Sequence, residues 1–138
     1  MTDSIRSPLT PYLTVRGAAA AIDFYRDAFG ATERMRMPAE DGERLLHAEL
    51  ALNGGVVYLS DEFPEHGGCG APGASGRSSV AISLALKGPQ EVDATHARAL
   101  AAGATAEMGP MDAFWGARFA TLRDPFGHRW MLSAPLGG

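Results

Sequence analysis

The chain carries the same order of structural signals twice, and this internal repeat limits its fold more than any other feature. The stretches Pro8–Glu62 and Arg77–Pro135 each open with alternating apolar and polar residues, the pattern of a half-buried strand. Each continues with apolar residues at helical spacing and then with three more strand-like segments. Because the order, the helix ends and the final turns all match, duplication explains the pattern better than chance. We therefore predict an α+β domain made of two βαβββ modules.

The expected boundaries follow from periodicity and from turn residues. Helices are predicted near Ala18–Phe29 and Gln90–Ala102, each followed by a glycine of the kind that ends helices. The turns Asn53–Gly55 and Asp124–Gly127 have the composition of tight hairpins. An alternating strand opens each module, and the other strands are expected at Thr32–Met37, Arg44–Leu52, Val56–Asp61, Thr105–Met108, Arg118–Arg123 and His128–Ser133.

The length of 138 residues suits one domain, 1–138, with modules at about 8–62 and 80–135. The segment 63–79 between them is rich in Gly, Ser and Pro, so we expect a linker or a mobile flap. Cys69 lies in this segment and is the only cysteine. A catalytic thiol would need a base beside it, so we interpret Cys69 as a tolerated loop residue.

Composition argues against several classes of function. The net charge is −4 and no basic stripe is present, so nucleic acid is not an expected partner. No apolar run is long enough to span a membrane, and the first residues lack the order of a signal peptide. We expect a cytoplasmic protein with neither a nucleic-acid nor a membrane partner.

Several segments resemble one family. The stretch Phe114–Trp130 is similar to the closing hairpin of the vicinal-oxygen-chelate superfamily, which includes glyoxalases, extradiol dioxygenases, and fosfomycin and bleomycin resistance proteins. Ala21–Tyr25 with Phe29–Ala31 resembles that superfamily's first helix and its end. The segments Pro11–Val15, Leu46–Leu50 and Leu59–Asp61 resemble the PhnB-like branch. The resemblance implies a sheet-lined cup with the helices outside, in a dimer that can exchange strands.

The resemblance also implies four metal-ligand positions, which enzymes of the family fill with His or Glu. Here those positions are Thr10, Tyr58, Ala81 and Met131, and none suits a divalent metal. Moving each strand by one residue offers no better donor and would turn the apolar face outward. We therefore predict no metal and no other cofactor at these positions.

Strand alternation predicts which side chains line the cup. Leu13, Leu59 and Leu132 belong to the set that should face the helices, which leaves the opposite face to the cup. The strand at 81–85 supplies only small residues to that face, which leaves volume for a guest. The turn Phe114–Gly116 could place an indole over it. The predicted ligand-binding residues are Tyr12, His47, Tyr58, Ser83, Trp115, Phe119 and Met131.

The histidines differ in their expected roles. His47 should face the cup together with Leu45 and Glu49, where it could donate a hydrogen bond, act as a base or help hold a metal. His128 is interpreted as structural, His66 as part of the flap and His96 as a residue of the helix surface.

Three polar residues in the second half have structural interpretations. Asp124 should cap its turn, because an Asp side chain accepts from nearby backbone N–H groups. Arg118 and Arg129 could meet an anionic group, but a nearby carboxylate is the more usual partner of such arginines.

The function that fits these features is metal-free binding, in which a homodimer sequesters a flat aromatic or hydrophobic compound such as an antibiotic. One alternative is an enzyme of the glyoxalase or dioxygenase type, either metal-free with His47 as a base or metal-dependent with His47 and Glu49 or Asp61 as unusual ligands. Another is a PhnB-like protein that binds a metabolite. No nucleophile motif is present to favour catalysis, so no catalytic residue is predicted.

Overall fold

The computed structural model describes residues 9–73 and 78–137, which form eight strands, two α-helices and one short 3₁₀ helix. The elements of the first module are β1 (Tyr12–Val15), α1 (Ala18–Phe29), β2 (Thr32–Pro38), β3 (Leu45–Leu52) and β4 (Gly55–Asp61). The 3₁₀ helix η1 (Pro64–His66) follows. The second module contains β5 (Ala81–Ala85), α2 (Pro89–Ala101), β6 (Thr105–Ala113), β7 (Ala117–Arg123) and β8 (Arg129–Pro135).

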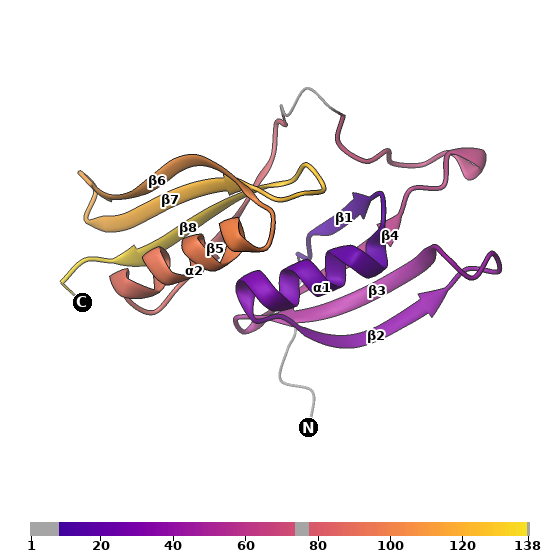
Figure 1. Ribbon diagram of the computed structural model, residues 1–138, viewed down its shortest axis with the longest axis horizontal. Coiled ribbons are helices and arrows are strands. Elements are labelled where there is room, and N and C mark those ends of the chain that lie inside the picture. Colours follow the sequence, from indigo (N-terminus) through magenta and orange to yellow (C-terminus); the bar gives the residue numbers. More distant parts are fainter. Residues whose placement is uncertain (1–8, 74–77, 138) are drawn as a thin grey trace.

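The two modules have the same topology, which confirms the predicted α+β fold of two βαβββ units. Their sheets have the strand orders β1-β4-β3-β2 and β5-β8-β7-β6. In each module the first strand pairs in parallel with the last, and the other pairs are antiparallel. The helices lie in front of both sheets, and α1 is next to α2 (Figure 1). The strands β1 and β5 therefore lie toward the middle of the molecule, while β2 and β6 form its outer edges.

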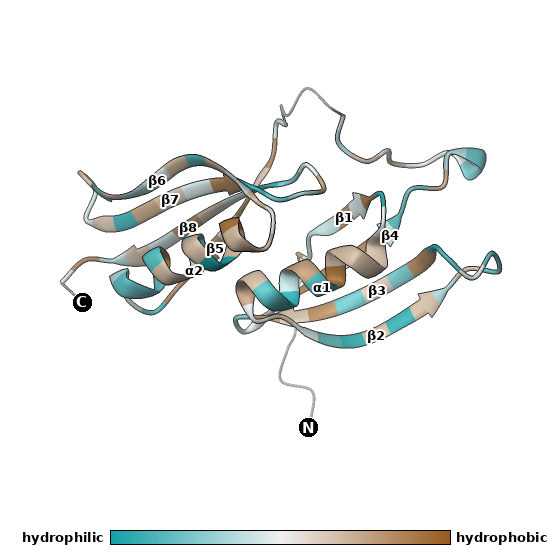
Figure 2. Cartoon of the chain, in the orientation of Figure 1, coloured by the Kyte–Doolittle hydropathy of each residue, from teal (hydrophilic) through white to brown (hydrophobic). Residues whose placement is uncertain are grey.

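One apolar core joins the modules beneath the two helices. Buried side chains from α1, α2 and both sheets belong to a single cluster, in which Trp130, Tyr25 and Ile22 are among the largest. Hydrophilic and hydrophobic residues follow one another along β3, as expected for a strand with one buried face (Figure 2). We call the side of each sheet that faces away from its helix the open face.

None of the described helices is long and apolar enough to cross a membrane.

Asp61 at the end of β4 holds the start of α1. The helix begins after Gly17, which has a φ of 99° and no side chain to cap the helix. One carboxylate oxygen of Asp61 accepts hydrogen bonds from the N–H groups of Gly17 and Ala18 at 2.7 and 2.9 Å. The other accepts from the N–H of Leu45 at 2.7 Å. A buried acidic side chain from a distant strand thus satisfies the N–H groups that a helix leaves unpaired at its start.

Asp124 ties its turn to both modules. It is 3% exposed, and Oδ1 accepts from the N–H groups of Phe126 and His128. Oδ2 accepts from the Tyr25 hydroxyl at 2.5 Å and from Trp130 Nε1 at 3.0 Å. The capping role that the sequence predicts is confirmed, and the carboxylate in addition links α1 of the first module to β8 of the second.

Because of this network, we expect the contribution of Tyr25 to the free energy of unfolding to decrease at alkaline pH. Burial, followed by the Asp124 carboxylate, raises the pKa of Tyr25 well above its ordinary value of 10.0. Above about pH 10 an unfolded chain ionises this phenol while the folded chain keeps it protonated, so stability falls as pH rises. We expect the Tyr25→Phe variant to be less stable than the wild type at pH 8, and the difference to shrink between pH 10 and 11. Urea unfolding at several pH values measures this, and a difference that stays constant with pH would contradict it.

The structure corrects two predictions about which side chains are buried. A register shift between Met37 and Pro38, opposite Leu46, reverses the expected faces at the start of β3. Leu45 is therefore in the core, whereas Leu46 is exposed. His96 is not on the helix surface but is 6% exposed on the inner side of α2. Its spacing of four from the buried Val92 places both residues on one helix face.

The segment between the modules passes close to the Asp124 turn. Gly127 has a φ of 99°, and a Cβ added there would come within 2.7 Å of the Pro72 side chain. Only glycine suits both the backbone angle and the close approach of the two segments. Part of the predicted flap, residues 74–77, lies outside the described residues.

Candidate functional site

The open face of the first sheet carries a cluster of four side chains, Tyr12, His47, Glu49 and Tyr58, which we call the Tyr–His cluster. Tyr12 and Tyr58 are paired across the parallel strands β1 and β4, and Glu49 is paired with Tyr58 across β3 and β4. The rings of Tyr12, His47 and Tyr58 lie 5.0 to 5.7 Å apart between centroids. The sequence predicted this face for all three rings.

Hydrogen bonds connect three members of the cluster in a chain. The Tyr12 hydroxyl lies 2.6 Å from His47 Nδ1, and His47 Nε2 lies 3.0 Å from a Glu49 carboxylate oxygen. Burial, followed by the Glu49 charge, raises the pKa of Tyr12 above its ordinary value, while the Ser60 hydroxyl acts in the opposite direction. Tyr12 is thus a neutral phenol under physiological conditions, and not a base.

The open face of the second sheet carries the other predicted ligand residues. Ser83 and Met131 are paired across β5 and β8, and Thr121 is paired with Met131 across β7 and β8. The ring of Phe119 on β7 makes an edge contact with Trp115 at 5.3 Å between centroids. Trp115 lies in the turn between β6 and β7 and is 55% exposed.

The turn that carries Trp115 lies at the far end of the second sheet from β1 (Figure 1). The sequence predicted that this turn could place an indole over the cup, but alternation could not predict the distance of the turn from the first module. Among the described residues, no ring contact or hydrogen bond joins Trp115 or Phe119 to the Tyr–His cluster. One chain therefore presents two separate aromatic surfaces.

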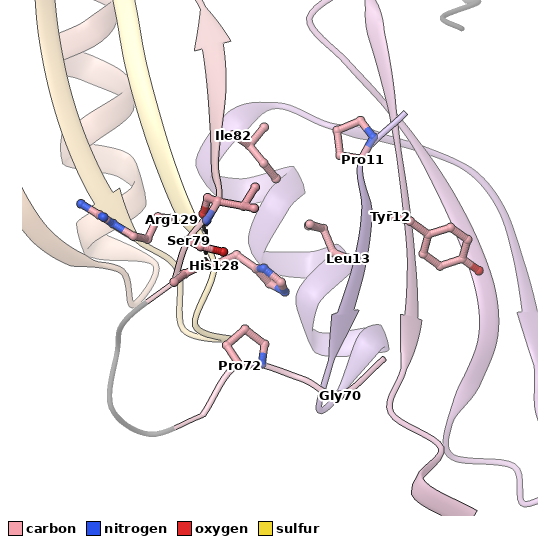
Figure 3. A pocket seen from close by; sticks show the side chains of 11 residues that line it. Pro11, Tyr12, Leu13, Gly70, Pro72, Ser79, Ile82, His128 and Arg129 are labelled. Carbon is pink, nitrogen blue, oxygen red and sulfur yellow. Dashed lines mark hydrogen bonds between the residues drawn. The ribbon is translucent and has the colours of Figure 1, made fainter. Parts of the chain in front are cut away.

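A cleft of about 480 Å³ lies between β1 and β5. Figure 3 shows the side chains of Leu13 and Ile82 pointing into it from the two strands, while Tyr12 turns its ring away toward the rest of the first sheet. Other lining residues are Pro72 of the connecting segment and Arg129 of β8. Its volume is within the range of small-molecule sites, and it separates the Tyr–His cluster from the second sheet.

The residues at the four positions implied by the resemblance do not fit a divalent metal. A hydroxyl, a phenol, a methyl group and a thioether occupy them, in Thr10, Tyr58, Ala81 and Met131. The described part of the chain also has no group of three or more His, Cys, Asp or Glu side chains that could hold a metal ion. Asp61, an alternative ligand suggested with His47, faces the helix side and is bonded to three backbone N–H groups.

Most other polar residues singled out in the sequence have structural partners. Arg118 pairs with Asp93 and Asp112, and Arg129 pairs with Glu107. His128 contacts the backbone oxygen of Thr14 at 2.9 Å, so it links the Asp124 turn to β1 as a structural residue. Two other predicted loop residues, Cys69 and His66, are exposed.

Sequence reasoning missed three polar interactions. It placed Glu49 on the same strand face as His47 and named it as a possible metal ligand, but it did not identify Glu49 as the carboxylate that bonds to His47. It also missed the bonds from Tyr25 and Trp130 to Asp124. Tyr25 lies 99 positions from Asp124, so no local pattern signals that pair.

Paired βαβββ modules define a class of fold, and comparisons with known proteins agree with this class. Residues 7–132 match the profile of the Glyoxalase/Bleomycin resistance protein/Dioxygenase superfamily. An uncharacterised protein of Mycobacterium bovis is 42% identical over 140 residues, covering 99% of this chain and 88% of that protein.

Solved structures show the same fold. The protein PA1353 of Pseudomonas aeruginosa has a TM-score of 0.75 and 25% identity, with 95% of this chain and 99% of that chain covered. The PhnB protein of Bacillus cereus has a TM-score of 0.72 and 20% identity, with 93% and 99% covered. The chain belongs to the Glyoxalase/Bleomycin resistance protein/Dioxygenase superfamily.

Proposed function

We propose that the protein binds a flat aromatic or hydrophobic small molecule, such as an antibiotic, without a metal and without changing it chemically. The observation that carries this proposal is the aromatic open face, where three rings of the Tyr–His cluster contact one another. Within the described residues, His47 and Glu49 have no third His, Cys, Asp or Glu beside them to complete a metal site. The superfamily includes bleomycin resistance proteins, which supports a sequestering role. Binding would draw on ring stacking and on burial of apolar surface.

The geometry favours binding over catalysis by His47. A general base removes the proton of a group hydrogen-bonded to it, which for His47 Nδ1 is the Tyr12 hydroxyl, but burial and the Glu49 charge raise the pKa of Tyr12 and oppose this step. Both nitrogens of His47 already have partners, Tyr12 and Glu49. Metal binding through Nδ1 would displace the Tyr12 hydroxyl, and the described residues place no group of three or more His, Cys, Asp or Glu side chains that could hold a metal ion. His47 therefore acts on a ligand through Tyr12 rather than directly.

We also propose that the binding unit is a homodimer. Several large apolar side chains are exposed, among them Phe114 at 97% and Val80 at 67%. Because Trp115 lies far from the Tyr–His cluster of its own chain, a partner chain is needed to bring an indole near that cluster. Covering apolar strand faces would also stabilise the pair. Light scattering at micromolar concentration should give twice the 14.5 kDa chain mass, and the monomer mass alone would contradict the dimer.

A fluorescence screen tests the proposed ligand class. The chain has two tryptophans, and Trp130 is buried, so an added compound should mainly quench Trp115. We expect some planar aromatic antibiotics to quench it at micromolar concentration, equally with EDTA or with added Mn²⁺. The Trp115→Phe variant is the control and should lose this signal. Quenching that needs a divalent metal would instead favour the enzyme alternative.

A further inference from the structure

We propose that Glu49, His47 and Tyr12 together make the Tyr12 oxygen a hydrogen-bond acceptor for the ligand, so that the site selects planar aromatic compounds with an N–H or O–H donor at the ring edge. This inference rests on the proposed binding function and specifies its ligand class. Tyr12 is the residue that meets the ligand, while His47 and Glu49 are positioning residues.

The direction of the hydrogen bonds follows from what each group can donate. A carboxylate only accepts, so the 3.0 Å contact between His47 Nε2 and Glu49 requires the proton on Nε2. A neutral imidazole has one N–H, which leaves Nδ1 as an acceptor. The 2.6 Å contact between Tyr12 and Nδ1 is then a bond in which the phenol donates. The only proton of the Tyr12 hydroxyl is thereby used inside the cluster.

The Tyr12 oxygen also lies beside the Ser60 hydroxyl, whose hydrogen bond opposes the rise in the Tyr12 pKa, and it keeps a further lone pair that can accept from a ligand. Tyr12 is 52% exposed, whereas the side chains of His47 and Glu49 are 21% and 23% exposed. Tyr12 is thus the most exposed of the three hydrogen-bonded side chains, and the one that a ligand can contact most easily. Its ring meets Tyr58 nearly edge-on, at an interplanar angle of 81°, which fixes its orientation on the open face.

The site should therefore select ligands by whether they present a hydrogen-bond donor or acceptor, as well as by their shape. A compound that presents an acceptor to Tyr12 would place two oxygen lone pairs against each other, because the phenolic proton already bonds His47. A compound with an N–H or O–H group would instead donate to the Tyr12 oxygen, so that hydrogen bonds connect the ligand, Tyr12, His47 and Glu49. Disfavouring the wrong partner in this way is a common source of specificity.

Nitrogen NMR of the free protein tests the proton positions without any ligand. In protein labelled with ¹⁵N-histidine, we expect His47 Nε2 to be protonated and Nδ1 unprotonated at neutral pH. The signals are assigned by their loss in His47→Gln. A protonated Nδ1 would free the Tyr12 proton for the ligand, and this result would overturn the proposal.

Carbazole and dibenzofuran test the selectivity, because they have nearly the same flat shape but only carbazole has an N–H donor. Equilibrium dialysis of the wild-type protein should show about fivefold tighter binding of carbazole, the effect of one ordinary hydrogen bond. The preference should disappear in Tyr12→Phe and decrease in Glu49→Gln. Thr14→Val is the control, since it removes a hydroxyl from the same strand outside the hydrogen-bonded chain.

The outcomes separate the two proposals. Equal binding of both compounds by the wild type, or a preference that persists in Tyr12→Phe, overturns the acceptor role of Tyr12 and leaves aromatic binding standing. Binding of neither compound up to its solubility limit overturns the proposed function, and this inference with it.

Discussion

The Asp124→Ala variant is expected to lose on the order of 4 kcal/mol of unfolding free energy, because it leaves several buried donors without an acceptor. The carboxylate accepts from the Tyr25 hydroxyl, from Trp130 Nε1 and from two backbone N–H groups of its turn. Each unpaired buried polar group costs about 1–3 kcal/mol. Urea unfolding followed by circular dichroism measures the loss.

Two variants serve as controls for Asp124→Ala. Asp124→Asn keeps an acceptor for the turn and should recover part of the stability. Asp112→Ala removes a carboxylate whose ion pair with Arg118 is largely solvent-exposed, and we expect a loss of less than about 1 kcal/mol. If Asp124→Ala were no less stable than Asp112→Ala, the network would not hold the modules together.

The Trp115→Ala variant is expected to weaken aromatic binding about tenfold while the fold stays intact, a loss of about 1.4 kcal/mol. Stacking on one aromatic side chain contributes on the order of 1–3 kcal/mol. Trp115 is half-exposed, and its ring contacts Phe114 and Phe119 near the turn, so little core packing depends on it. Calorimetric titration with the strongest quencher from the screen measures the effect.

Trp115→Phe keeps a flat ring and should retain most of the affinity. Leu100→Ala removes an exposed apolar side chain from α2, on the helix side of the sheet, and should leave the affinity unchanged. Unchanged affinity in both Trp115→Ala and Tyr58→Ala would show that stacking does not hold the ligand.

The elements of this fold are predictable from sequence because they depend on local periodicity. The helix expected at Ala18–Phe29 has those bounds in the structure, and the second differs by one residue at each end. The glycine-containing hairpin turns mark the final strands of both modules correctly. Alternation also predicts the buried faces of β1, β4 and β8, since a shift of one residue would expose the core.

The errors arise where the structure departs from regular periodicity or depends on distant contacts. The bulge at Leu46 adds one residue to β3 and reverses its first side chains. The strand expected at Thr105–Met108 continues to Ala113, with its pairing interrupted around Gly109 and Pro110. His96 is buried although it is polar, because β6, β7 and β8 pack against α2.

The candidate site is predictable only in part for the same reason. Strand alternation places Tyr12, His47 and Tyr58 on one face, and the structure brings their rings together. Alternation does not give the distance between Trp115 and that cluster, because this distance depends on how the two modules are joined. We therefore predict that a continuous aromatic site is formed by two chains, with the Tyr–His cluster from one and Trp115 from the other.

The central claim is that an aromatic compound binds without a metal, and calorimetric titration after exhaustive dialysis against EDTA tests it most directly. The compound is the strongest quencher from the screen, and the titration is repeated with Mn²⁺ or Zn²⁺ added back. The account predicts one site per chain, with a Kd that changes by less than about twofold between these conditions. Loss of binding after EDTA, with recovery on addition of metal, would contradict it.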